Sequence, residues 1–114
     1  MPFIVVSFQA PHRISTCYCD EQGFLGYSKA HLRNRTVQMF HGAKTDADRL
    51  SSVIEKSAEN KPLVARFELY DACGECRTVM LNISAFCGLG GTPVACKISI
   101  ESFLIKVTEN PAKK

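Results

Sequence analysis

The sequence of 114 residues has no long apolar run and no signal for export. No stretch approaches the roughly 18 apolar residues that cross a membrane. Residues 3–8 form a short apolar stretch, but no basic residue precedes it and no small-residue cleavage site lies near it, so it does not fit a signal peptide. We therefore expect an intracellular, cytoplasmic protein with no membrane partner.

Concentrated charge is also missing. The chain has 14 Lys and Arg residues against 11 Asp and Glu residues, which gives a net charge of +3. The basic residues are scattered along the sequence, and Lys113-Lys114 is their only run. A nucleic-acid-binding domain normally carries a basic stripe or cluster, so we expect no nucleic acid partner.

No constellation typical of an enzyme assembles in the sequence. There is no serine-centred elbow and no pair of carboxylates in apolar surroundings, and the glycine-rich stretch 88–91 has no helix after it to bind phosphate. We predict that the protein is not an enzyme.

A disulfide framework is not expected either, because the cytoplasm keeps thiols reduced. Six cysteines are present, and Cys73 and Cys76 form a C-x-x-C motif in a predicted hairpin turn. A redox motif of this kind opens a helix. Tetrahedral zinc needs two more ligands, which Cys17 and Cys19 would supply only if their strand lay beside the hairpin. We favour core or turn positions for all six cysteines and no metal site, with zinc binding and redox chemistry as the alternatives.

The apolar pattern predicts one domain over residues 1–108 and a polar C-terminal tail over residues 109–114. Two short strands are predicted at 3–8 and 13–19, and Ser28 is expected to cap one helical turn. The clearest helix opens at Thr45, in a capping box with Asp48, and ends at Lys61-Pro62. Its apolar residues recur at spacings of three and four, which is typical of a helix with one buried side.

After Pro62 the apolar period drops to two. Three strands are predicted at 63–70, 79–86 and 94–101, joined by hairpin connections at 71–75 and 88–91. Each strand has one purely apolar face and one mixed face, as in an antiparallel sheet that is covered on one side. The sequence thus predicts an α+β fold with a five-stranded antiparallel sheet and helices on one face.

This order of elements, together with three local motifs, resembles the PAS domain family. Residues 20–28 resemble the PAS segment in which an aromatic and a Gly-Tyr-Ser step precede a short helix. Residues 40–46 resemble the Leu-Gln-Gly-x-x-Thr-Asp signature of the light-oxygen-voltage (LOV) subgroup, and residues 69–74 lie where that subgroup has its Asn-Tyr-x-x-x-Gly hairpin. The resemblance covers roughly residues 3–103 and implies the PAS fold with a sensory or regulatory role.

The departures from the LOV subgroup concern the residues that would contact a flavin. The photochemical cysteine falls at Val37, whose side chain has no thiol to form a flavin adduct. Glu55 replaces a phosphate-pairing arginine, and Leu69 and Val79 replace two asparagines at the flavin ring edge. Haem-binding PAS domains usually take their iron ligand from the main helix or the loop after it, whereas His41 lies before that helix. We expect no cofactor, and flavin mononucleotide in particular is not expected.

Two surfaces follow from the resemblance. A ligand, if present, would lie between the main helix and the apolar sheet face, with an empty packed core as the alternative. The candidate pocket residues are Val37, Phe40, Ile54, Phe67, Leu69, Val79 and Leu81. The mixed sheet face is the predicted interaction surface, with Val64, Tyr70, Met80, Phe86, Phe103 and Ile105 on it.

We therefore predict a sensory or regulatory PAS domain that acts in signal reception or protein–protein interaction. The expected partner is a second copy of the chain, another protein or a flanking helix, bound through the mixed sheet face. The alternative is a sensor domain that binds a small molecule or a cofactor, in the manner of LOV or haem-binding domains.

Overall fold

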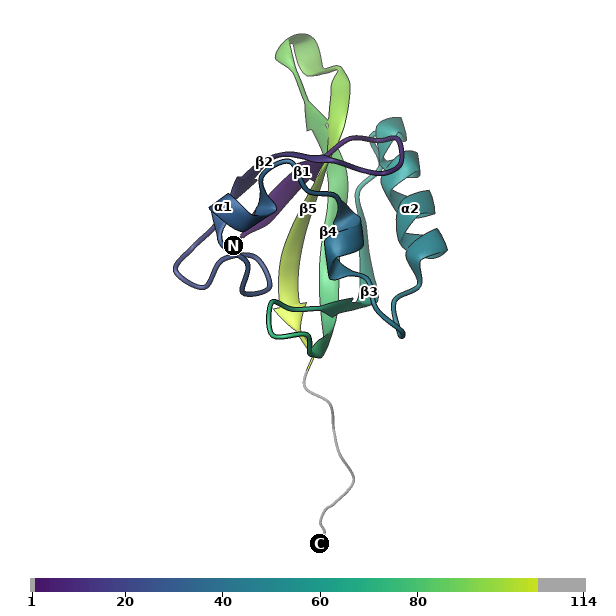
Figure 1. The fold of residues 1–114 in the computed structure, drawn as a ribbon. Helices are drawn as coiled ribbons and strands as arrows, with labels where there is room; N and C mark the ends of the chain where they lie inside the picture. The colour runs from purple at the N-terminus through teal and green to yellow at the C-terminus, as the bar shows by residue number, and fades with distance from the viewer. Residues whose placement is uncertain (1, 105–114) are drawn as a thin grey trace, which may run out of the picture.

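The period-two segments form one antiparallel sheet in the structure, a computed structural model that describes residues 2–104 (Figure 1). The five strands lie in the order β2-β1-β5-β4-β3. They are β1 (Phe3–Val6), β2 (Ile14–Tyr18), β3 (Leu63–Tyr70), β4 (Cys76–Cys87) and β5 (Pro93–Phe103). The helices are α1 (Lys29–Leu32), η1 (Val37–Phe40), α2 (Ala47–Lys56), η2 (Ser57–Glu59) and η3 (Leu89–Gly91), where η marks a 3-10 helix. The predicted α+β fold is confirmed.

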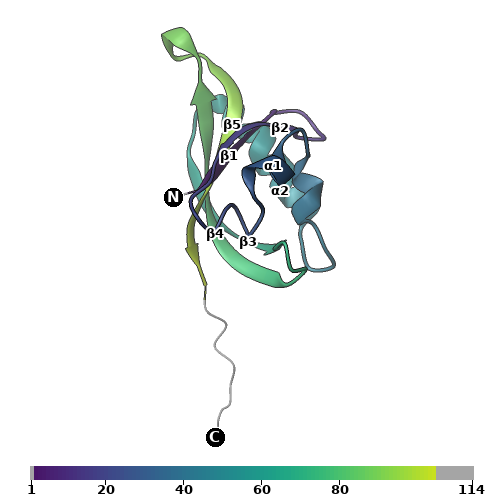
Figure 2. The ribbon, with the colours of Figure 1, turned by 60° about the vertical axis from the view of Figure 1, so that its left-hand side comes forward.

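Helices α1, η1 and α2 all cover the same face of the sheet, and the other face carries none of them (Figure 2). Each strand directs every second side chain toward these helices, where the apolar side chains of both layers form one buried core. The rings of Phe24 and Phe40, whose centroids lie 5.3 Å apart, pack within this layer. The apolar residues that alternate in the sequence are therefore the ones that point to the covered face of the sheet.

Strands β4 and β5 are longer than predicted because they pair beyond the part of the sheet that lies under the helices. Strand β4 begins at Cys76 and strand β5 ends at Phe103. At the opposite end the β4–β5 hairpin projects from the sheet (Figure 1), and Leu89 near its tip is fully exposed. Apolar alternation marks only the covered part of a strand, so it could not show these extensions.

The first turn of α2 differs from the prediction. Its N-cap is Asp46, whose Oδ1 accepts a hydrogen bond from the Arg49 N–H at 3.1 Å. The predicted capping box of Thr45 with Asp48 is wrong, because the Thr45 hydroxyl is used elsewhere. It accepts from the Gly42 N–H at 3.1 Å and donates to the Glu68 carbonyl at 2.8 Å.

These contacts cover the edge of the sheet at β3. Besides Thr45, the Arg49 guanidinium donates to the Arg66 carbonyl at 2.9 Å and lies 4.1 Å from the centre of the Phe67 ring. An unpaired strand edge is a template for association with other chains unless other groups cover it. Thr45, just before α2, and Arg49, in its first turn, thus donate hydrogen bonds to backbone carbonyl groups of β3.

We predict that Asp46→Ala lowers the free energy of unfolding by about 1 kcal/mol, because it removes the N-cap acceptor of α2. Asp48→Ala is the control, and its loss should be smaller because that carboxylate interacts only with the helix dipole. Urea unfolding followed by circular dichroism measures both changes. A larger loss in Asp48→Ala than in Asp46→Ala would contradict this assignment of the cap.

Candidate functional site

The predicted pocket residues form the packed centre of the apolar layer. None of their side chains is more than 3% exposed, and all belong to the same core cluster. These residues are Val37, Phe40, Ile54, Phe67, Leu69, Val79 and Leu81. Three surface cavities, of about 700, 600 and 190 Å³, are lined by other residues. The structure therefore brings the seven residues together as packing partners.

One buried polar atom lacks a partner in the described part of the chain, and it belongs to His41, the residue that caps η1. Burial of the ring, together with the charge of nearby His12, lowers the pKa of His41. Both ring nitrogens of His12, in contrast, have hydrogen-bond partners. Its Nδ1 lies 3.0 Å from the Ser7 carbonyl, and its Nε2 lies 2.8 Å from the Ser51 hydroxyl. His41 is thus held neutral beside the core.

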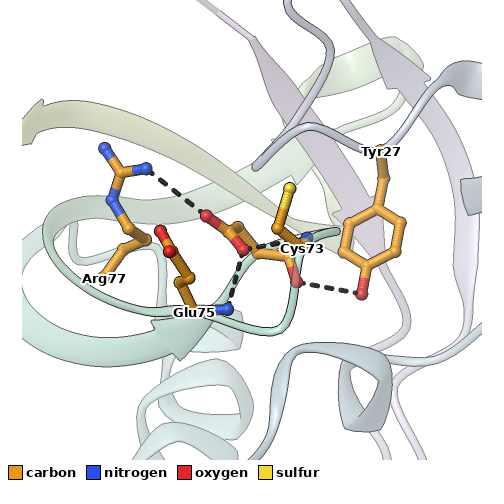
Figure 3. Close-up of polar contacts among 5 residues, drawn as sticks. Tyr27, Cys73, Glu75 and Arg77 are labelled. Carbon is orange, nitrogen blue, oxygen red and sulfur yellow. Dashed lines mark hydrogen bonds and ion pairs between the residues drawn. The ribbon is translucent and has the colours of Figure 1, made fainter.

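Asp71, in the turn that joins β3 to β4, holds several polar groups together, and Figure 3 shows its partners Tyr27, Cys73, Glu75 and Arg77. Its Oδ1 accepts from the backbone N–H groups of Cys73 and Glu75 at 3.0 and 2.9 Å. Its Oδ2 pairs with the Arg77 guanidinium at 3.3 Å. The hydroxyl of Tyr27 donates to the Asp71 carbonyl at 3.5 Å and links the turn to the loop before α1.

The Asp71 side chain is 11% exposed, and its pKa is lowered. Burial alone would raise the pKa, since it penalises the charged form. The hydrogen bonds from Glu75 and Cys73 and the charge of Arg77 outweigh this penalty because they stabilise the ionised form. Asp71 therefore acts as a charged internal cap of the turn.

The turn also forms one wall of the cavity of about 600 Å³. The Ala72 N–H donates to the Leu25 carbonyl at 2.9 Å, and this contact fixes the turn against the loop that forms the second wall. The end of β5 closes the cavity with Phe103, and the Arg77 guanidinium lies 4.9 Å from the centre of that ring. Since Asp71 already neutralises Arg77, the cavity offers no unpaired cation from this residue to an anionic ligand.

The cysteines of the C-x-x-C motif lie at this turn but do not assemble a metal site. Cys73 is exposed and Cys76 is the first residue of β4. Cys17 and Cys19 lie in and after β2, at the opposite edge of the sheet from β3. Within residues 2–104, no three His, Cys, Asp or Glu side chains are grouped so that they could hold a metal ion. Within the same residues, no helix is long and apolar enough to cross a membrane.

The residues predicted for the helix-free face have different surroundings. Val64 is 51% exposed and Met80 is half-buried. The Tyr70 ring packs on Gly42, where any side chain would collide with it, and its hydroxyl accepts from the Lys44 N–H at 3.1 Å. Tyr70 is thus partly covered by its own chain.

Phe103 lies at the end of β5, where the alternation of side chains along the strand changes. A β-bulge in the β4–β5 pair brings it opposite Val79, and directly paired residues point to the same side of a sheet. Phe103 also lines the cavity of about 700 Å³ together with Arg66 and Thr78, whose side chains alternate with the core residues of β3 and β4, so its part in the interaction surface stays a prediction. Ile105 and the predicted tail 109–114 lie outside the described residues.

Comparison with solved structures supports the fold at low sequence identity. The PAS domain of a protein from Colwellia psychrerythraea superposes with a TM-score of 0.72 at 16% identity, over 90% of this chain and 85% of that one. The chain has the PAS fold. A light-oxygen-voltage domain, from work on its mechanism with a flavin analogue, gives a TM-score of 0.70 at 15% identity, over 92% and 78% of the two chains. No protein-family model matches the chain, and a search of curated proteins gives no match.

The pattern of the sequence predicts that the seven residues lie together, but it gives no indication that Asp71 is the centre of a network. A signal was present, because an Asp followed three residues later by Gly74 is typical of a turn in which the Asp side chain accepts backbone hydrogen bonds. The Gly74 N–H indeed donates to the Asp71 carbonyl at 2.9 Å, and Gly74 has a positive φ of 81°. Only the fold shows that Arg77 and Tyr27 complete the network.

We predict that Asp71→Asn lowers the free energy of unfolding at neutral pH by about 1.5–3 kcal/mol, the range for hydrogen bonds to a charged group. Because the folded-state pKa is lowered, the stabilisation by Asp71 is present above its unfolded-state pKa and is lost as the pH falls through the folded-state value. The difference between wild type and variant should therefore narrow in acid. Urea unfolding at neutral and acidic pH measures this change.

Glu75→Gln is the matched control, because Glu75 is exposed and contributes its backbone rather than its carboxylate to the network. Its effect should stay within about 0.5 kcal/mol, as for other surface substitutions. A difference between wild type and Asp71→Asn that stayed constant into acid would show that the charge of Asp71 is not what stabilises the turn.

Proposed function

We propose that this domain is a regulatory PAS module that acts through protein–protein contacts rather than through a bound cofactor. The observation that supports this most directly is the packing of the apolar layer. The seven residues that would line a ligand pocket are all buried against one another. A sensory role that depends on a ligand between helix and sheet would require space in this layer.

The same residues argue against LOV photochemistry. Val37 stands at the position of the photochemical cysteine and is buried in η1, so no thiol faces the layer there. Leu69 and Val79 present hydrocarbon where a flavin ring edge needs hydrogen-bond partners, and such unmade bonds are costly in a dry environment. Glu55 is exposed on α2 and would repel a phosphate. Flavin mononucleotide is therefore not proposed as a ligand.

The surface that we propose for contact is the helix-free face of the sheet. No element of the described chain covers it (Figure 2). Val64, Met80 and Phe86 lie on it, and Phe86 is paired with Ala95 where the β4–β5 hairpin begins to project. Polar pairs such as Asn82 with Glu101 at 3.1 Å lie between the apolar groups. Such a mixed face suits a second copy of the domain or a flanking amphipathic helix.

We predict that the purified protein has no absorption band in the visible range and that blue light leaves its spectrum unchanged. The reason is that Val37 stands where the resemblance places the adduct-forming cysteine, and that the seven candidate pocket residues are packed together in the core. Absorption spectroscopy before and after illumination, with and without added flavin mononucleotide, measures this. A flavin band that bleaches in blue light and recovers in the dark would refute the proposal.

We predict that the domain self-associates and that Met80→Glu weakens the association by more than about ten-fold, because a charge replaces an apolar side chain that the contact would bury. Ser52→Glu, on the exposed side of α2, adds the same charge away from the face and should have little effect. Sedimentation equilibrium measures the dissociation constants, and circular dichroism confirms that both variants fold. A monomeric wild type at high concentration, or equal effects of the two variants, would argue against this face.

A further inference from the structure

The two edges of the sheet are treated differently. At β3, the side chains of Thr45 and Arg49 occupy outward-facing carbonyl groups. At β2, only the start of the strand has such a partner, since the Ile14 N–H donates to the Arg35 carbonyl at 2.8 Å. For residues 15–18 the described chain supplies no backbone partner beyond the sheet. This part of β2 is an open edge, which can accept another strand.

A small groove runs along this open edge. It has a volume of about 190 Å³ and lies between the strand and α1. Its walls are residues 14–17 of β2 on one side and the side chains of Lys29 and Arg33 on the other. Both basic residues are exposed, and neither has a carboxylate within ion-pair distance in the described chain. The groove thus combines free backbone groups with two unneutralised cations.

The segment that contains α1 carries only positive charges. Residues 22–45 contain no Asp or Glu, and four of their basic or histidine side chains fall between Lys29 and Arg35. Arg13 joins them, since its guanidinium donates to the Asn34 carbonyl at 2.8 Å. Arg13, Lys29, Arg33 and Arg35, which are spread over 23 positions of the sequence, therefore lie on or next to β2 and its groove.

The opposite side of the same strand is aromatic. Tyr18 is 52% exposed and its ring stacks on that of Phe3, with centroids 5.9 Å apart. The Lys97 ammonium lies 4.4 Å from the centre of the Phe3 ring. A strand added at β2 would therefore direct alternate side chains toward the cations beside α1 and toward this aromatic surface.

We propose that the β2 edge is a docking site for an extended peptide of alternating acidic and apolar residues, which adds to the sheet as a sixth strand. Backbone hydrogen bonds to residues 15–18 hold the peptide, and its carboxylates pair with Lys29 and Arg33. A second copy of this chain does not fit, because pairing β2 with β2 would bring two basic flanks together. The open edge at residues 15–18 lies at the other end of the strand order from Val64 on β3, and Val64, Met80 and Phe86 take no part in it, so its failure would leave the function proposed above untouched.

The test uses a fluorescein-labelled heptapeptide of alternating glutamate and valine, whose binding to the full chain is followed by fluorescence anisotropy. We expect saturable binding that the double variant Lys29→Glu/Arg33→Glu weakens at least about ten-fold, because two attractions become repulsions. The double variant Lys56→Glu/Lys61→Glu changes the net charge equally at exposed positions away from β2, and should bind as wild type does. Circular dichroism checks that both variants fold.

Two further measurements separate strand addition from attraction between charges. A peptide N-methylated at alternate amides keeps its carboxylates but cannot complete the ladder, so it should bind at least about ten-fold more weakly. The amide hydrogens of residues 15–18 should exchange more slowly in the complex. Equal binding of the methylated peptide, equal loss in both double variants, absence of saturable binding, or tighter binding of a thymidine oligonucleotide that displaces the peptide would each overturn the proposal.

Discussion

The structure depends on one constraint, the burial of a single apolar face of a five-stranded sheet. That face is covered by α1, η1 and α2, and the layer between them is filled by side chains. Burial of apolar surface is the dominant favourable contribution to folding, so a small domain gains most by filling this layer completely. Val37, Leu69 and Val79 all contribute to that filling. The packing that stabilises the fold thus uses the seven residues that the sequence offers as a candidate pocket.

What remains for function is the surface that this layer leaves uncovered. The helix-free face is mixed in character, with Val64 exposed and polar pairs between the apolar groups. The β3 edge is closed by Thr45 and Arg49, whereas residues 15–18 of β2 remain open beside basic side chains. These two surfaces are the ones that we propose for contacts with other proteins. Asp71 has a structural role, because the hydrogen bonds that lower its pKa also fix the turn after β3.

The sequence predicted the elements that periodicity can reveal, and the fold comparison confirms their arrangement. The helix of α2, the Ser28 cap of α1 and the α+β sheet follow from local patterns. The misplaced features depend on contacts between distant segments. Thr45 was assigned to a helix cap because its contact with Glu68 lies 23 residues away. At Phe103, a β-bulge changes the alternation that a regular strand would keep.

Native mass spectrometry of the purified protein, compared with its denatured spectrum, tests most directly whether the apolar layer is filled by side chains. We predict a native mass equal to that of the polypeptide, or to a whole multiple of it, with no additional component in either spectrum. A small molecule present in one-to-one ratio with the native chain and released on denaturation, whatever its colour, would contradict this account. It would show that the layer between α2 and the sheet opens to hold a ligand.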